Sequence, residues 1–201
     1  MTTSRLEAFS DGVLAIAVTL LVLDLHVPMP RSGASLAHQL GQEWPNFAAY
    51  AISFATIGII WINHHAMIRR LQAVDHTILT LNLGLLLSIG LLPFTTALMA
   101  AYVNRGQGQH VAAAIYSGSF LLMSVMFSAT QRHILFSKTH LLRPQIVERD
   151  RRAILARGVM GLVPYAIATA LAIVSAYATL AVCAVVAAIY ALPRTTADSA
   201  D

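Results

Sequence analysis

Polar side chains interrupt the first long apolar stretch of this sequence near both of its ends. Ser10 and Asp11 follow Arg5 and Phe9 close to its start, and Asp24 lies close to its end. A carboxylate at the centre of a membrane helix costs about 2.5–3.5 kcal/mol on insertion scales unless it meets protein partners or water. These positions therefore predict contacts with neighbouring helices or with a water-filled path.

The apolar residues between these polar positions form a narrow stripe. Ile16, Leu20 and Leu23 recur at the spacing of one helix face, and Asp11 projects to nearly the opposite side. Such a stripe is more often a packing or lipid-facing surface than a functional one. Thr19 lies about 60° from the stripe. Its hydroxyl has two open uses, a bond to a carbonyl one turn earlier in its own helix or an oxygen presented to a cation.

Further polar residues occur in the second and third apolar stretches. Asp11 is acceptor-only when ionised, whereas arginine, indole and imidazole groups can donate to it. We therefore expect one polar network that holds the first helix against the next two. Phe9 belongs to the motif of the first helix, and the network consists of Arg5, Ser10, Asp11, Trp61, His64, His65 and Asn82. Adjacent histidines on a helix diverge by about 100° and cannot both bind one ion, so we predict no metal site.

The composition indicates the elements that must position these residues. With 57% hydrophobic and 11% charged residues, the chain is too apolar for a soluble globule and fits an all-α, polytopic membrane protein. Residues 159–192 carry no charge and are too many for one straight span, so we expect them to fold back near Ser175. One domain, 1–201, is predicted, with transmembrane helices at about 8–27, 46–70, 76–103, 110–132, 153–175 and 176–193.

The distribution of basic residues predicts the orientation in the membrane. With the N-terminus inside, only Arg31 and Arg105 fall outside, and the inner segments hold Arg5, Arg69, Arg70, Arg132, Lys138, Arg143, Arg149, Arg151, Arg152, Arg157 and Arg194. This bias predicts that both termini lie in the cytoplasm. The membrane is expected to be the plasma membrane. The basic clusters then favour anionic membrane lipids as partners over nucleic acid, because no soluble basic domain or recognition motif is present.

The N-terminal half resembles the transmembrane-protein-175 family of potassium channels. The resemblance covers about residues 5–96 and rests on Arg5, Phe9-Ser10-Asp11, Leu23-Asp24, Trp61-Ile-Asn-His64-His65, Asn82 and Leu91-Leu92-Pro93-Phe94. It implies a homotetramer in which the first helix of each copy lines a potassium path, with no cofactor. The Gly-Tyr-Gly signature of the carbonyl filter of other potassium channels is not found in the sequence.

The same resemblance assigns roles to single residues. Ile16, Leu20 and Leu23 would form stacked hydrophobic rings, with Ile16 as the gate, and such rings can close by dewetting. Thr19 would be the selectivity layer. From its position near the outer end of the helix, Asp24 is either a solvated helix-end carboxylate, which its place on the flank of the stripe favours, or part of an acidic vestibule formed by four copies. Modest selectivity for potassium over sodium is expected.

Three other classes of function are weighed against a channel. A proton- or cation-coupled transporter would also use intramembrane carboxylates and histidines, but the chain lacks an evident inverted repeat. A membrane enzyme is disfavoured because no nucleophile motif or phosphate-binding loop occurs. A purely structural scaffold would leave the polar motif of the first helix without a reason.

Overall fold

The computed structural model describes residues 2–25, 27–29, 35–143 and 148–192. Within these ranges the chain forms helices joined by turns, and no β-strand occurs in them. The prediction of an all-α membrane protein is confirmed. The helices are α1 (Thr3–Leu20), η1 (Leu21–Asp24), α2 (Leu36–Gln42), α3 (Trp44–Ile68), α4 (His76–Gly90), α5 (Leu92–Tyr102), α6 (Gln109–Arg132), η2 (His133–Ser137), η3 (Thr139–Leu141), α7 (Glu148–Val159), α8 (Leu162–Leu171) and α9 (Ala176–Ala191).

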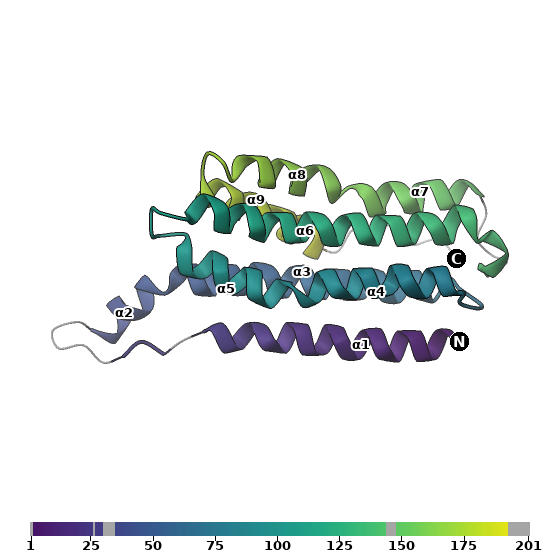
Figure 1. Ribbon diagram of the computed structural model, residues 1–201, viewed down its shortest axis with the longest axis horizontal. Helices are drawn as coiled ribbons and strands as arrows, with labels where there is room; N and C mark the ends of the chain where they lie inside the picture. Colours follow the sequence, from purple (N-terminus) through teal and green to yellow (C-terminus); the bar gives the residue numbers. More distant parts are fainter. Residues whose placement is uncertain (1, 26, 30–34, 144–147, 193–201) are drawn as a thin grey trace, which may run out of the picture.

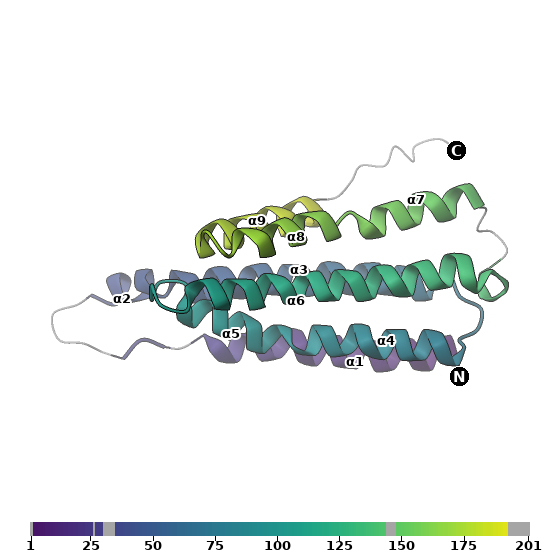
Figure 2. The same cartoon turned by 45° about the horizontal axis from the view of Figure 1, so that its top comes forward.

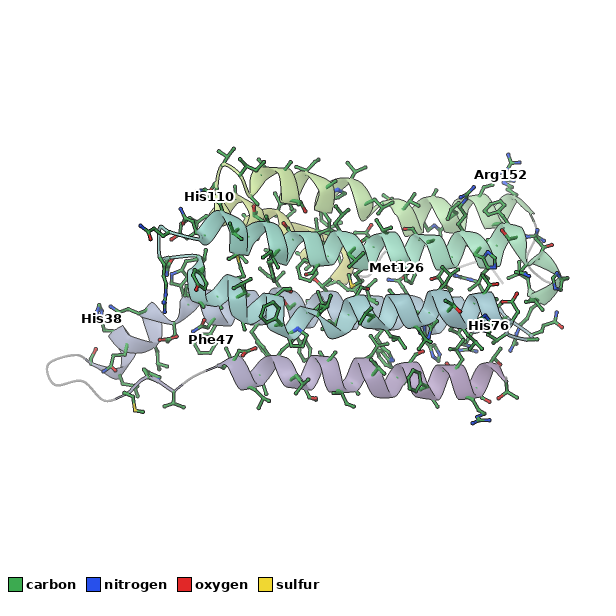
Figure 3. All side chains as sticks on the ribbon, viewed as in Figure 1. His38, Phe47, His76, His110, Met126 and Arg152 are labelled. Carbon is green, nitrogen blue, oxygen red and sulfur yellow. The ribbon has the colours of Figure 1, made fainter. Side chains whose placement is uncertain are left out.

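The long helices run along one common axis, as Figures 1 and 2 show. α1 lies at one edge of the bundle and packs on α3 and α4. α6 occupies the middle, where it contacts α4, α5, α7, α8 and α9. A Cβ at Gly84 would lie 2.4 Å from Met126 Cε, so α4 meets α6 at close range (Met126 is labelled in Figure 3).

Several helix bounds differ from the predicted ones for identifiable reasons. The first helical segment begins at Thr3 and ends at Asp24, because Leu25 is extended with φ −81° and ψ 101°. The predicted helix 76–103 is divided at Leu91, where Pro93 lacks the N–H that a continuous helix needs. The predicted helix 153–175 is likewise divided, into α7 and α8. The short helix α2 was not predicted, and the Ser35 side chain caps its start.

In the part of the chain that the structure describes, five helical segments have the length and composition to cross a membrane: Thr3–Asp24, Trp44–Ile68, His76–Tyr102, Gln109–Ser137 and Arg149–Leu171. The apolar helix α9 is shorter, with 16 residues. It starts after a turn at Ser175, whose Oγ accepts a bond from the N–H of Ala178. The end of the predicted helix 176–193 lies outside the described residues.

Two loops at one end of the bundle are bound to each other. The connection after α3 forms an antiparallel bridge, Leu71 to Leu142, with the connection after α6. Asp75, the N-cap of α4, accepts from Lys138 at 2.9 Å. The bond from Lys138, together with the backbone N–H of Ile78, lowers the pKa of the Asp75 carboxyl. We call this arrangement the loop clasp.

The loop clasp marks the end of the bundle where most described basic residues gather. Arg152 and His76 are labelled at this end in Figure 3, and His38 and His110 at the opposite end. The α5–α6 connection at the opposite end carries Arg105. Arg31 and Arg194, which also enter the predicted charge bias, lie outside the described residues.

Candidate functional site: the exposed face of helix α1 and its polar contacts

Helix α1 has one face buried in the bundle and one face open. Its buried face consists of Leu6, Ser10, Leu14 and Ala17, followed by Leu21 of η1. The opposite face carries large apolar side chains that the described residues leave exposed: Ile16 is 61% exposed, Leu20 43% and Leu23 69%. In η1 the tighter turn stacks residues three apart, so Leu23 stays in line with Leu20. The predicted stripe is therefore a continuous exposed apolar surface.

The Thr19 hydroxyl lies on this open face and bonds within its own helix. Its Oγ1 donates to the carbonyl of Ile16 at 2.9 Å. This is one of the two uses that the sequence left open. It does not exclude the other, because donating one hydrogen leaves the acceptor lone pairs of the oxygen free.

Two polar contacts at the rim of α1 join it to the C-terminal half of α3. Glu7 Oε1 pairs with His65 Nδ1 at 2.5 Å, and one turn further along α1 Asp11 Oδ1 accepts from Trp61 Nε1 at 2.9 Å. Both pairs join residues four apart on one helix to residues four apart on the other. Since the two helices are antiparallel, this spacing makes two successive rungs that fix the register of α1 on α3.

A buried hydrogen-bond chain links α1, α4 and α3 beneath these rungs. Asn82 Nδ2 donates to Ser10 Oγ at 3.0 Å, and Ser10 Oγ donates to the Leu6 carbonyl at 2.9 Å. Asn82 Oδ1 lies 2.7 Å from His64 Nε2. An amide oxygen only accepts, so Nε2 carries the proton and His64 Nδ1 is the bare nitrogen. Ser10, His64 and Asn82 have no exposed surface, and His64 Nδ1 has no partner among the described residues.

The structure thus brings six of the seven proposed network residues into contacts and leaves Arg5 outside them. Ser10, Asn82 and His64 form the buried chain, while Asp11, Trp61 and His65 form the rim. Phe9 is 52% exposed on the open face, and Arg5 is exposed without a polar partner among the described residues. Asp24 is half-buried at the end of η1.

One residue of this site was missed by the sequence reasoning. Glu7, the partner of His65, lies four residues before Asp11 and so on the same face of α1. Trp61 and His65 are also four residues apart. This equal spacing could have predicted that Glu7 pairs with His65 where Asp11 pairs with Trp61. Among the described residues, no group of three His, Cys, Asp or Glu side chains is placed to hold a metal ion.

The sequence of this chain is similar to proteins of one known family. The family model described as "Endosomal/lysosomal potassium channel TMEM175" matches residues 5–93. A potassium channel of Streptomyces collinus is 42% identical over 180 residues, 89% of this chain and 86% of that protein. A potassium channel of Chamaesiphon minutus is 36% identical over 94% of each chain.

A solved structure agrees with the sequence comparisons. The crystal structure of a lysosomal potassium-selective channel TMEM175 homolog from Chamaesiphon minutus superposes with a TM-score of 0.84 at 35% identity, and the match covers 94% of this chain and 96% of that one. The resemblance noted in the sequence is confirmed. The chain belongs to the TMEM175 family.

Proposed function

We propose that this protein is a passive potassium channel whose ion path is lined by the exposed face of α1. The observation that carries the proposal is the division of α1 into a tightly bound polar side and an exposed apolar stripe. Related proteins that the chain matches along most of their length are named potassium channels. Those names favour a channel over a coupled transporter, and none of them describes an enzyme.

The proposed assembly is a homotetramer with four copies of α1 around a central path. Ile16, Leu20 and Leu23 would then form three apolar rings, with Ile16 as the gate. A narrow apolar ring empties of water easily, so a small change in its width can stop conduction. In this arrangement the rungs to α3 and the buried chain to α4 hold each copy of α1 at a fixed distance from the axis.

Selectivity is proposed to arise where Thr19 lies beside the rings. Its hydroxyl already donates to the carbonyl of Ile16, which turns its acceptor lone pairs outward from that bond. A partly dehydrated cation could be coordinated there, and potassium, which holds its water less tightly than sodium, would be favoured modestly. Asp24 from each copy would add negative charge at the outer mouth.

The proposal also includes the orientation of the protein in the membrane and its partners. The end of the bundle with the loop clasp and most basic residues would face the cytoplasm, in line with the positive-inside bias. Both termini would then be cytoplasmic, in a plasma membrane whose anionic lipids contact the basic residues. No cofactor, catalytic activity or nucleic-acid partner is proposed.

The test is ion flux from liposomes that contain the purified protein. Potassium-loaded and sodium-loaded vesicles are compared for the unsubstituted chain, for Ile16→Asn and for Ile189→Asn. Ile189 is a matched control, because it is an isoleucine of α9 that is 51% exposed, close to the 61% of Ile16. We expect fast potassium flux, weaker sodium flux, and an increase of sodium flux in Ile16→Asn only.

Two results would count against the proposal. Equal effects of Ile16→Asn and Ile189→Asn would remove α1 from the ion path. Flux that requires an imposed proton gradient and saturates would indicate a coupled transporter, and His64 and Asp11 would become the residues to substitute next.

A further inference from the structure

A cavity of about 540 Å³ lies on the far side of α3 from α1, between α3, α6, α7, α8 and α9. This volume is within the range of about 300–1,000 Å³ that small-molecule sites occupy. Its walls are mainly apolar and include Ile59, Ile60, Phe127, Ile154, Tyr165 and Leu192. Ile62 and Leu192 line it and are themselves 61% and 67% exposed, so the cavity opens to the surface at the depth of the transmembrane helices.

Two arginines line the same cavity without an acidic partner among the described residues. Arg70 is the second residue after α3 and is half-buried, and Arg157 lies on α7 and is exposed. Neither forms an ion pair with any described residue. Burial, with a smaller contribution from the charge of Arg157, lowers the pKa of the Arg70 guanidinium. Two neighbouring positive charges that lack a counter-charge disfavour each other, and an anion between them would remove this cost.

Other features at this end of the cavity favour a preformed site. The loop clasp fixes Arg70, because the Arg143 N–H donates to the Arg70 carbonyl at 2.9 Å. Gln131 also lines the cavity, and its buried Oε1 accepts no hydrogen bond from the described residues, so it is open to a hydroxyl donor of a headgroup and not to the anionic group itself. Gly158 allows this placement, since a Cβ there would lie 1.7 Å from that oxygen.

We infer that this cavity binds an anionic membrane lipid, with the phosphate or carboxylate of its headgroup between Arg70 and Arg157 and one acyl chain along the apolar walls. The charges alone would suit a free anion, which has no use for an apolar cavity open to the membrane. The apolar walls alone would suit a neutral lipid, which would leave two arginines uncompensated. Only an anionic amphiphile matches both the two arginines and the apolar walls of the cavity.

The test is lipid binding to the purified full-length protein, measured by native mass spectrometry. The probes are a short-chain phosphatidylglycerol, the phosphatidylcholine of the same chain length, and a fatty acid of that length. The charge variants are Arg70→Gln and Arg157→Gln, with Arg69→Gln as control, because Arg69 is exposed and does not line the cavity. Gly58→Leu would fill the cavity from α3, and Gly118→Leu is its control, since both glycines have open space at Cβ.

We expect an anionic lipid to bind once per chain and more tightly than phosphatidylcholine. Arg70→Gln and Arg157→Gln should each weaken its binding about tenfold, the loss of one charge-assisted contact, while Arg69→Gln has no effect. Gly58→Leu should abolish binding and Gly118→Leu should not. Tighter binding of phosphatidylglycerol than of the fatty acid would identify phospholipid as the source, and the reverse order would identify free fatty acid.

The inference is overturned if neither anionic lipid binds more tightly than phosphatidylcholine, or if Arg69→Gln weakens binding as much as Arg70→Gln does. It is also overturned if lipid binds only when Asp198→Asn and Asp201→Asn are both present. That result would mean that carboxylates of the C-terminal segment, and not a lipid headgroup, are the partners of the two arginines. Because the readout is bound lipid and not ion flux, its failure is distinguishable from failure of the proposed channel function.

Discussion

Removing the central residue of the buried hydrogen-bond chain should destabilise the protein measurably. Asn82 on α4 bonds both Ser10 on α1 and His64 on α3, and all three side chains are fully buried. Asn82→Leu leaves the His64 Nε2–H without an acceptor, whereas Ser10 keeps its bond to the Leu6 carbonyl. Most of the free-energy cost of the substitution should therefore come from the unpaired N–H of His64.

The expected magnitude follows from the two bonds lost. Hydrogen bonds between membrane helices contribute about 0.6 kcal/mol on average and at most about 1.7 kcal/mol, so losing two should cost about 1–3 kcal/mol. The upper part of this range is expected, because no water reaches the chain to replace the missing partner. Asn63→Leu is the control, since Asn63 is exposed and bonds only the Ile59 carbonyl of its own helix.

The assay is reversible unfolding in mixed micelles, with increasing denaturing detergent and tryptophan fluorescence as the signal. A double-mutant cycle with His64→Leu isolates the His64–Asn82 bond from changes in side-chain volume. We expect a coupling free energy of about 0.6–1.7 kcal/mol and a double variant less destabilised than the single costs add up to. A coupling of zero, or an Asn82→Leu cost no larger than that of Asn63→Leu, would refute the reasoning.

Three more predictions concern contacts described above. Asp75→Ala should lower the free energy of unfolding by about 1 kcal/mol through loss of the N-cap, and Asp75→Asn should lower it by less. Since the pKa of Asp75 is lowered in the folded state, its charge stabilises the fold above the ordinary carboxyl pKa. Denaturation curves should show that this electrostatic stabilisation is lost as the pH falls through the lowered pKa. Gly158→Ala should be less stable than Gly58→Ala by about 1 kcal/mol, the lower end of the cost of overpacking, because its Cβ would displace the Gln131 amide at the end of a flexible side chain. Equal thermal midpoints of the two variants would contradict this. Trp61→Phe should lower the free energy of unfolding by about 0.5–1 kcal/mol, because the indole N–H no longer donates to Asp11, and it should alter potassium flux. An unchanged free energy of unfolding would show that this hydrogen bond does not stabilise the packing of α1 on α3.

The sequence allowed good prediction of what lies along a single helix and poorer prediction of what depends on other segments. The stripe of Ile16, Leu20 and Leu23 follows from helix periodicity alone, so its exposure as one surface could be anticipated. Partners of polar side chains could not be fixed in the same way. Arg5 was expected to donate within the network, yet it is exposed without a polar partner among the described residues, and Glu7 pairs with His65.

The missed features of the fold have a similar origin. Apolar composition continues through Leu91, so hydropathy indicates one span where Pro93 divides it into α4 and α5. The helix α2 is too short and too polar for a periodic signal, and its cap at Ser35 is a local contact. The position of the open face of α1 relative to other copies depends on the assembly, which a single chain does not contain.

The shortness of α9 has a consequence for the bilayer itself. At about 1.5 Å per residue its 16 residues span about 24 Å, less than the hydrocarbon core of about 30 Å. It cannot be prolonged, because Leu192 is extended with ψ 128°. In the proposed membrane arrangement, α9 matches the bilayer where the hydrocarbon is locally thinner or where flanking residues cover the difference, while the longer helices match the full thickness. A change in membrane thickness, set by acyl-chain length, should therefore act first at this flank, next to the cavity between α3 and α9.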